Sequence, residues 1–125
     1  MNTGVVIIAI INMCLGAFFI AFSIPFLRGK IHKNAWYGFR VGAKTEEEWQ
    51  RINVFGAQRF IVWSKWLIGI ALLSLAVYGI SFAMTIPTAV FIVIFIFDIF
   101  CGAIFPLIAV FQTAFYASDI SSSSR

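Results

Sequence analysis

The chain has 125 residues, of which 62% are hydrophobic and only 11% are charged, and its mean hydropathy is +0.98. Soluble domains carry roughly 25% charged residues, so this composition excludes a water-soluble globular domain. We therefore expect one small domain, residues 1–125, whose solvent is mostly lipid. A net charge of +4 would suggest nucleic acid as a partner, but the basic residues gather in one stretch between apolar segments, which argues against it.

Three apolar segments are long enough to cross a bilayer, which takes about 20 residues. They cover roughly residues 4–27, 60–84 and 86–112. The first has neither the basic start nor the small-residue cleavage site of a signal peptide, so we expect a retained helix. The second and third are separated by only a few residues, which predicts an antiparallel hairpin. The sequence thus predicts an all-α fold, an integral membrane three-helix bundle.

The distribution of positive charge predicts how this bundle is oriented. Basic residues occupy the connection 28–59, and the second connection has no charged residue. Those of the first connection are Arg28, Lys30, Lys33, Arg40, Lys44, Arg51 and Arg59. The positive-inside rule places this loop in the cytoplasm, so that the N-terminus lies outside a plasma (inner) membrane and the C-terminus inside. The polar, Ser-rich tail from Ser118 is assigned no function.

Within the loop, a helix is predicted to begin at Thr45. Thr45 and Glu48 can form a capping box, and the three glutamates that follow Thr45 interact favourably with the helix dipole. Trp49, Ile52 and Phe55 then recur at helical spacing. We expect a short interfacial helix that leads into the second membrane segment.

The same loop carries a recognisable pattern of residues: Asn34, Tyr37, Gly38, Phe39, Arg40, Thr45, Trp49, Asn53 and Gly56. It resembles the SdpI-type family of small bacterial membrane proteins, whose pattern is Asn, Tyr-Gly-hydrophobic-Arg-Thr, Thr, Trp, Asn and Gly. This chain has Val41 and Gly42 where the family often continues with Thr-Pro. The resemblance implies a multi-pass protein of the bacterial plasma membrane. In the founding member this family is linked to immunity against a secreted toxin and to membrane sequestration of a repressor.

Each of these loop residues could have either a structural role or a role in recognition. Arg40 could bind a phosphate, a toxin carboxylate or a loop carbonyl. Thr45 and Asn53 are residue types that often organise helix ends. His32 has no carboxylate or cysteine at ligand spacing, so we expect a solvated histidine and no metal site.

Two charged residues interrupt the later membrane segments. Asp98 is expected about 12 Å, and Lys65 about 8 Å, from the cytoplasmic side of the hydrocarbon layer. Because these depths are similar, we predict a Lys65–Asp98 pair that neutralises both charges between the hairpin helices. A proton or ion relay, a ligand counter-ion, or a snorkelling Lys65 beside a protonated Asp98 are the alternatives.

Small and polar residues predict which helix faces meet. The inner face of the third helix is expected to contain Asp98, Cys101, Gly102, Phe105, Ala109 and Gln112. Close approach is also predicted at Gly16, Ala17 and Ala21, and at Gly69, Ala76, Gly79 and Ala83. Cys14 and Cys101 are expected to pack as buried thiols.

No Ser/His/Asp, HExxH or Walker pattern is present, so the sequence predicts no enzyme and no cofactor. The first hypothesis is a non-enzymatic SdpI-like membrane protein that protects the cell from a membrane-active peptide toxin, with signalling or sequestration as a further role. An accessory subunit of a larger membrane complex is the alternative. A lipid-processing enzyme or an ion-coupled transporter is a third class, which rests on Arg40, Asn53 and Asp98.

Overall fold

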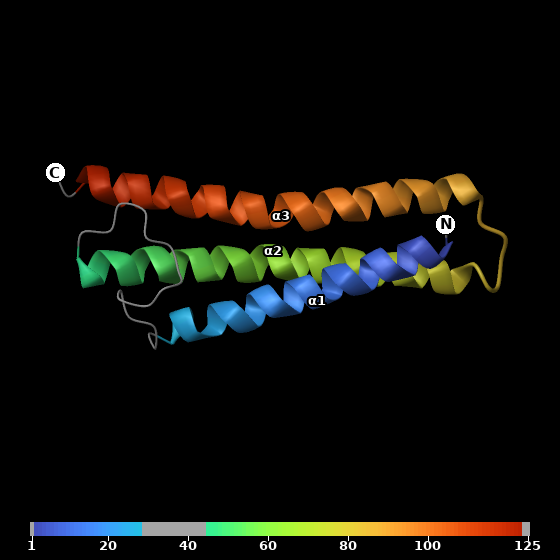
Figure 1. Cartoon of the computed structure of the whole chain (residues 1–125), viewed down its shortest axis with the longest axis horizontal. Coiled ribbons are helices and arrows are strands. Elements are labelled where there is room, and N and C mark those ends of the chain that lie inside the picture. Colours follow the sequence, from blue (N-terminus) through green and yellow to red (C-terminus); the bar gives the residue numbers. More distant parts are fainter. Residues whose placement is uncertain (1, 29–44, 124–125) are drawn as a thin grey trace.

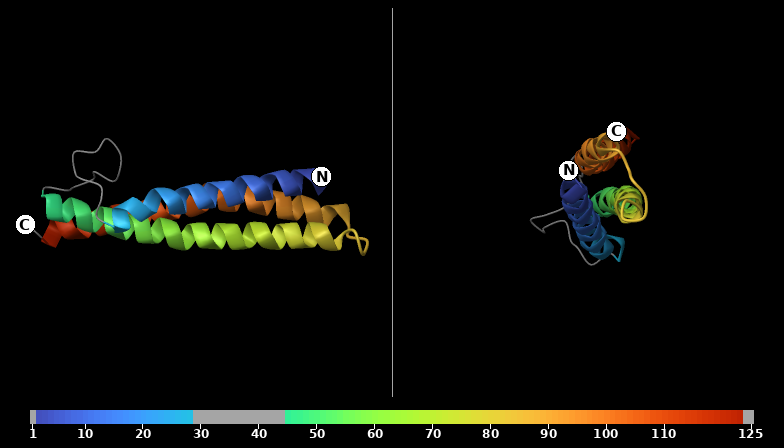
Figure 2. Two further views of the ribbon diagram at one scale, coloured as in Figure 1. Left: turned by 90° about the horizontal axis from the view of Figure 1, so that it is seen from below. Right: turned by 90° about the vertical axis from the view of Figure 1, so that its right-hand side faces the viewer.

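A computed structural model describes residues 2–28 and 45–123 of the chain, and these form three helices. They are α1 (Asn2–Leu27), α2 (Glu46–Ile80) and α3 (Thr88–Ser123). The helices alternate in direction, so that the N-terminus lies beside the turn between α2 and α3 (Figure 1). Seen along the bundle, they occupy the corners of a triangle (Figure 2). The predicted all-α, three-helix bundle is confirmed.

Each helix is long and apolar enough to cross a membrane, over Thr3–Leu27, Glu46–Ile80 and Thr88–Asp119. At 1.5 Å per residue the 26, 35 and 36 residues of α1, α2 and α3 are about 39, 52 and 54 Å long. A hydrocarbon layer is about 30 Å thick. All three helices can therefore span it, and α2 and α3 also extend beyond the end of α1 (Figure 1).

The helix boundaries differ from the prediction in the second and third segments. A helix does begin after Thr45, but it continues without a break to Ile80, so a separate interfacial helix is not observed. Residues 46–80 contain no proline to interrupt it. The third helix continues past the predicted end at residue 112, because the polar residues of the tail are also compatible with a helix.

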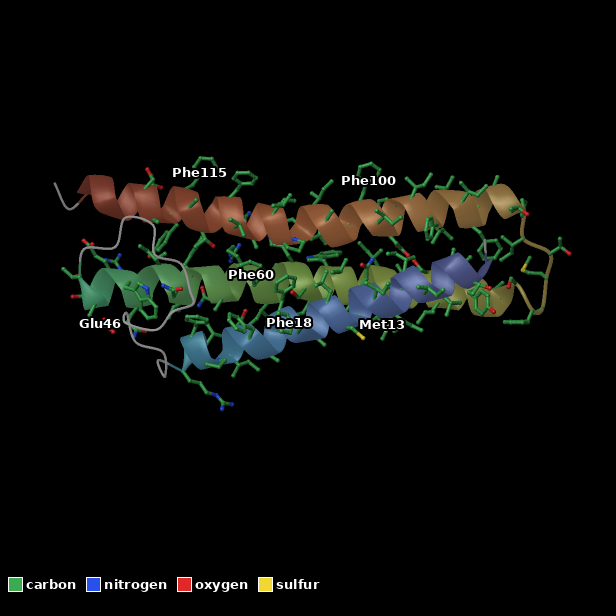
Figure 3. All side chains as sticks on the ribbon, viewed as in Figure 1. Met13, Phe18, Glu46, Phe60, Phe100 and Phe115 are labelled. Carbon is green, nitrogen blue, oxygen red and sulfur yellow. The ribbon has the colours of Figure 1, made fainter. Side chains whose placement is uncertain are left out.

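Large apolar side chains cover the outside of the bundle. Phe100 and Phe115 are 59% and 70% exposed, and both point away from the other helices (Figure 3). Leu73 of α2 is similarly exposed. Since lipid is as apolar as these side chains, this surface is the one a bilayer requires.

The small residues predicted for close approach divide into two groups. Gly16 is buried against α2, where an added methyl group would lie 2.7 Å from Ile68 Cγ1 and 3.1 Å from the carbonyl oxygen of Ser64. The corresponding prediction was wrong for Ala17 and Ala21 of α1, and for Gly69, Ala76, Gly79 and Ala83 in and after α2, which are all exposed. The small residues of α2 that are buried are Gly56, Ala57, Ser64, Ala71 and Ser74.

Candidate functional site

A polar cluster lies where the three helices meet, and each helix contributes one residue to it. Asn12 of α1, Ser74 of α2 and Asp98 of α3 are 2%, 5% and 0% exposed. The amide nitrogen Nδ2 of Asn12 donates a 2.9 Å hydrogen bond to the carbonyl oxygen of Asp98. Asn12 and Asp98 lie about 15 Å from the starts of α1 and α3, close to the middle of a layer about 30 Å thick. This polar centre is therefore at mid-membrane depth.

The carboxylate of Asp98 is buried without a hydrogen-bond partner at either oxygen. Asp98 and Ser74 line a cavity of about 190 Å³ between α2 and α3, and Leu73 and Phe97 stand at the same cavity. Leu73 and Phe97 are 68% and 54% exposed, so the cavity reaches the lipid-facing surface. Unpaired polar groups in a membrane interior are costly and often functional, which makes Asp98 the first candidate site residue.

The predicted pair between Lys65 and Asp98 is not formed between these two described residues. Lys65 is exposed beside Trp66 and Gly69, in a different cavity, and Asp98 has no partner. Ser74 is the residue of α2 at the level of Asp98, and it lies roughly 13 Å along the helix from Lys65. The sequence-based depths were misleading because the second segment was counted from Phe60, whereas α2 begins at Glu46.

The predicted inner face of α3 does meet the other helices. Asp98, Cys101 and Ala109 are buried. Gln112 accepts a 3.1 Å hydrogen bond from the indole nitrogen of Trp63 in α2, and the Trp63 ring packs on Phe105 with centroids 5.2 Å apart. The expectation of two buried thiols holds for Cys101 and is wrong for Cys14, which is exposed on α1.

The second candidate site is built from the part of the family pattern that the structure describes. Thr45 is the N-cap of α2, and its hydroxyl accepts a 3.1 Å hydrogen bond from the backbone N–H of Glu48. Trp49, Asn53 and Gly56 follow on one buried face of the helix, at spacings of four and three residues. Asn34, Tyr37, Gly38 and Arg40 lie outside the described residues.

Trp49 and Asn53 anchor this face to α1. The Trp49 ring packs 6.2 Å from the ring of Phe26, and the two residues form a buried cluster with Ala57. The Asn53 amide nitrogen donates a 2.9 Å hydrogen bond to the carbonyl oxygen of Trp49. The indole nitrogen of Trp49 is buried without a hydrogen-bond partner, although buried indoles usually have one.

An aromatic crevice of about 250 Å³ lies between α1 and α2, beside this cluster. Its walls come from both helices: Phe18, Phe19, Phe22, Ser23, Phe26, Asn53, Ala57 and Phe60. The rings of Phe19 and Phe60 pack across it, with centroids 5.2 Å apart. Phe18 and Phe22 are 60% and 42% exposed at its rim, whereas Ser23 and Asn53 are buried and polar. The crevice can accept an apolar group, and the Ser23 hydroxyl in its wall donates a 2.7 Å hydrogen bond to the carbonyl oxygen of Phe19.

Arg59 of α2 lies at the same end of the bundle as the aromatic crevice, next to α3. The Arg59 guanidinium stands 5.4 Å over the ring of Phe55, which stacks on Tyr116 of α3 with centroids 4.2 Å apart. The Nε atom of Arg59 is buried without a hydrogen-bond partner. This cation–π contact keeps the positive charge of Arg59 where α2 and α3 meet.

Sequence reasoning missed Asn12 and Ser74, which complete the polar centre. Asn12 stands alone in a long apolar run, as Asp98 does, and the cost of burying its amide was the signal that could have identified it. Ser74 gives a weaker signal, because a serine hydroxyl can be satisfied within its own helix. Its hydroxyl donates to the carbonyl oxygen of Ile70 at 3.1 Å.

The fold and the two sites define an integral membrane bundle with a polar centre and a lateral aromatic crevice. Comparison with known proteins found no matching family, no similar curated protein and no similar solved structure.

Proposed function

We propose that this chain is a non-enzymatic protein of the bacterial plasma membrane that resembles SdpI-type immunity proteins and protects the cell from a membrane-active peptide. The observation that carries the proposal is the position of Asn53, a residue of the family pattern, in the wall of the aromatic crevice. A residue of the loop pattern and a cavity of about 250 Å³ thus occur at the same place.

The crevice suits a ligand that arrives through the lipid. Membrane-active peptides place apolar side chains at the boundary between headgroups and acyl chains. The exposed rings of Phe18 and Phe22 form an apolar entrance, and the walls can hold one or two apolar side chains. The buried amide of Asn53 and hydroxyl of Ser23 would then contact a backbone group of the peptide.

The charge distribution supports an orientation with the crevice toward the cytoplasm. The end of the bundle near Glu46 carries most of the charged residues of the described chain, including Arg28, Arg51 and Arg59. Residues 81–87 at the opposite end carry none. In a version without the native cysteines, Thr85→Cys should react with a membrane-impermeant maleimide on intact cells, and Glu47→Cys should react only after lysis.

A sensitivity assay tests the proposed function. The chain is expressed in a bacterial strain that is sensitive to a panel of membrane-active peptides, and survival is compared with that of the empty vector. We expect protection against at least one peptide, loss of protection for Asn53→Leu, and full protection for Phe115→Ala, whose ring is exposed on α3. Membrane levels of each variant are measured in parallel. Unchanged sensitivity to every peptide would contradict the proposal.

A second candidate function, accessory subunit of a membrane complex, is favoured by one surface of α2. Gly69 and Gly79 have no neighbouring atom within 4 Å of an added methyl group, so this face is unpacked within the described residues. Small residues of this kind let a second transmembrane helix approach closely. A stoichiometric partner that copurifies in mild detergent and is lost in Gly69→Leu would favour this function over the first.

A further inference from the structure

A lysine stands on the lipid-facing surface of α2, inside the membrane-spanning part of the helix. Lys65 is exposed, and it is the one charged residue of positions 60–97. Its depth follows from Gly16 of α1, because a methyl group there would lie 3.1 Å from the backbone oxygen of Ser64, the residue before Lys65. Gly16 is four residues, about 6 Å, from Asn12 at mid-membrane depth. Lys65 is therefore about 9 Å from the nearer boundary of a layer about 30 Å thick.

The chain does not supply a negative charge at this level. All of its acidic residues belong to the described part, and they are Glu46, Glu47, Glu48, Asp98 and Asp119. The three glutamates are about 25 Å or more along α2 from Lys65, and Asp98 lies roughly 13 Å away in the other direction. Asp119 is exposed about 10 Å beyond Gln112, which bonds to Trp63. A lone charge in hydrocarbon is costly, so the neutralising group comes from outside the chain.

The surface around Lys65 has the shape and the hydrogen-bond donors to receive a helix. A groove of about 340 Å³ runs along α2 here, bordered by Lys65, Trp66, Gly69, Ile70 and Leu73. Gly69 has no neighbouring atom within 4 Å of an added methyl group, and small residues of this kind let a second helix approach closely. Trp66 is 63% exposed, and an indole nitrogen can only donate. The ammonium group and the indole thus offer two donors, and a matching occupant supplies an acceptor.

We propose that this groove binds a transmembrane helix of another protein, which carries an aspartate or glutamate at the depth of Lys65. The proposal rests on the second candidate function, an accessory subunit, and names the chemistry of its partner. A carboxylate fits because it neutralises the ammonium group and accepts hydrogen bonds from both donors. The open backbone at Gly69 lets the partner helix come close enough for this contact.

The other negatively charged or self-complementary occupants fit less well. A second copy of the chain is disfavoured, since a symmetric dimer across this groove would place Lys65 against Lys65. A lipid phosphate lies in the headgroup region, about 9 Å or more from the level of Lys65. This distance is greater than the four-carbon stem of a lysine covers. A carboxylate on a membrane-spanning helix, by contrast, can stand at the level of Lys65 itself.

Model transmembrane peptides test the proposal directly. The full-length protein, with a donor dye on Glu47→Cys in a version without the native cysteines, is reconstituted in phosphatidylcholine vesicles. Peptides of about 20 leucine and alanine residues carry the acceptor dye. One has a glutamate six residues from one end, about 9 Å deep, and the others have glutamine or leucine at that position. We expect more energy transfer to the glutamate peptide than to the leucine peptide, with the glutamine peptide close to leucine.

Variants of the protein then assign the effect to the groove. Lys65→Met should lower the transfer to the glutamate peptide to the level of the leucine peptide, and Lys65→Arg should retain it. Phe115→Ala, which alters an exposed ring of α3, should leave it unchanged. Equal transfer from wild type to all three peptides would overturn the proposal and would mean that Lys65 extends toward the lipid headgroups. This comparison needs no variant, so a folding defect cannot obscure it.

The outcome for the partner's chemistry is distinguishable from the outcome for the accessory function. A partner that copurifies with wild type and with Lys65→Met, but is lost in Gly69→Leu, would support an accessory subunit and contradict the acidic partner helix. Specific binding of the glutamate peptide without any copurifying partner would support the recognition of an acidic helix and count against the accessory function.

Discussion

Asn12 donates a 2.9 Å hydrogen bond to the carbonyl oxygen of Asp98, and these residues are 86 positions apart in the chain. The bond joins α1 to α3 at the level where Ser74 of α2 completes the polar centre. On the other side of the amide, Asn12 Oδ1 faces Gly102, one turn after Asp98. The approach of α1 to α3 therefore depends on an amide at position 12 and on the absence of a side chain at position 102.

The first prediction is that Asn12 and Gly102 are energetically coupled. Gly102→Ala would place a methyl group 2.5 Å from Asn12 Oδ1, and overpacking of this kind costs about 1–3 kcal/mol. Asn12→Ala should cost about 0.6 kcal/mol, the average for interhelical hydrogen bonds in membranes, and no more than about 1.7 kcal/mol. The double variant should lose less than the sum, because the truncated residue 12 no longer meets the methyl group. Unfolding in mixed detergent micelles measures all three free energies, and strict additivity would refute the coupling.

The second prediction compares two glycines of the membrane segments. Gly16→Ala should destabilise the bundle, since the methyl group would lie 3.1 Å from the backbone oxygen of Ser64, which cannot move independently of α2. Gly69→Ala adds a methyl group into open space and should stabilise the protein by about 0.5–1 kcal/mol through helix propensity. The same unfolding assay is used for both. Equal effects of the two substitutions would show that α1 does not approach α2 at Gly16.

The third prediction concerns the start of α2. Thr45→Ala removes the side-chain acceptor of the Glu48 N–H and should cost about 1 kcal/mol of local helix stability, whereas Thr45→Ser should retain it. Hydrogen–deuterium exchange at the Glu48 amide is the appropriate measurement, since the loss is confined to the first turn. Exchange of Glu48 that is as slow in the alanine variant as in wild type would argue against the cap.

The fourth prediction is that Lys65 and Asp98 act independently. Lys65 is exposed and lies at a different level from Asp98, so Lys65→Met should change the unfolding free energy little. Asp98→Asn should have its own effect, and the two effects should add within about 0.5 kcal/mol. A coupling energy well above this value, from a double-mutant cycle, would restore the ion pair that the sequence suggested.

The sequence predicts the number and directions of the helices well because length and hydropathy determine what a bilayer accepts. It also identifies the inner face of α3, where Asp98 and Gln112 stand out against phenylalanine and isoleucine. The pairing of residues between helices could not be predicted in this way. A register shift of a few residues leaves hydropathy unchanged, yet it decides whether Asp98 meets Ser74 or Lys65.

The α2 surface shows a second limit of sequence reasoning. Glycine and alanine suggest close packing, but Gly69 and Gly79 are open, whereas Ser64 and Ser74 are buried together with Ala71. A serine in a membrane helix can satisfy its hydroxyl on its own backbone, as Ser74 does with Ile70, and then behaves as a small side chain. Composition alone does not distinguish these two uses of small residues.

The unbroken course of α2 sets how the two candidate sites are joined. Sharp bends in helices occur at proline, at glycine–serine pairs or at local bulges, and residues 46–80 contain no proline. Asn53 in the wall of the aromatic crevice and Ser74 in the polar centre therefore belong to one continuous helix, about 32 Å apart along its axis.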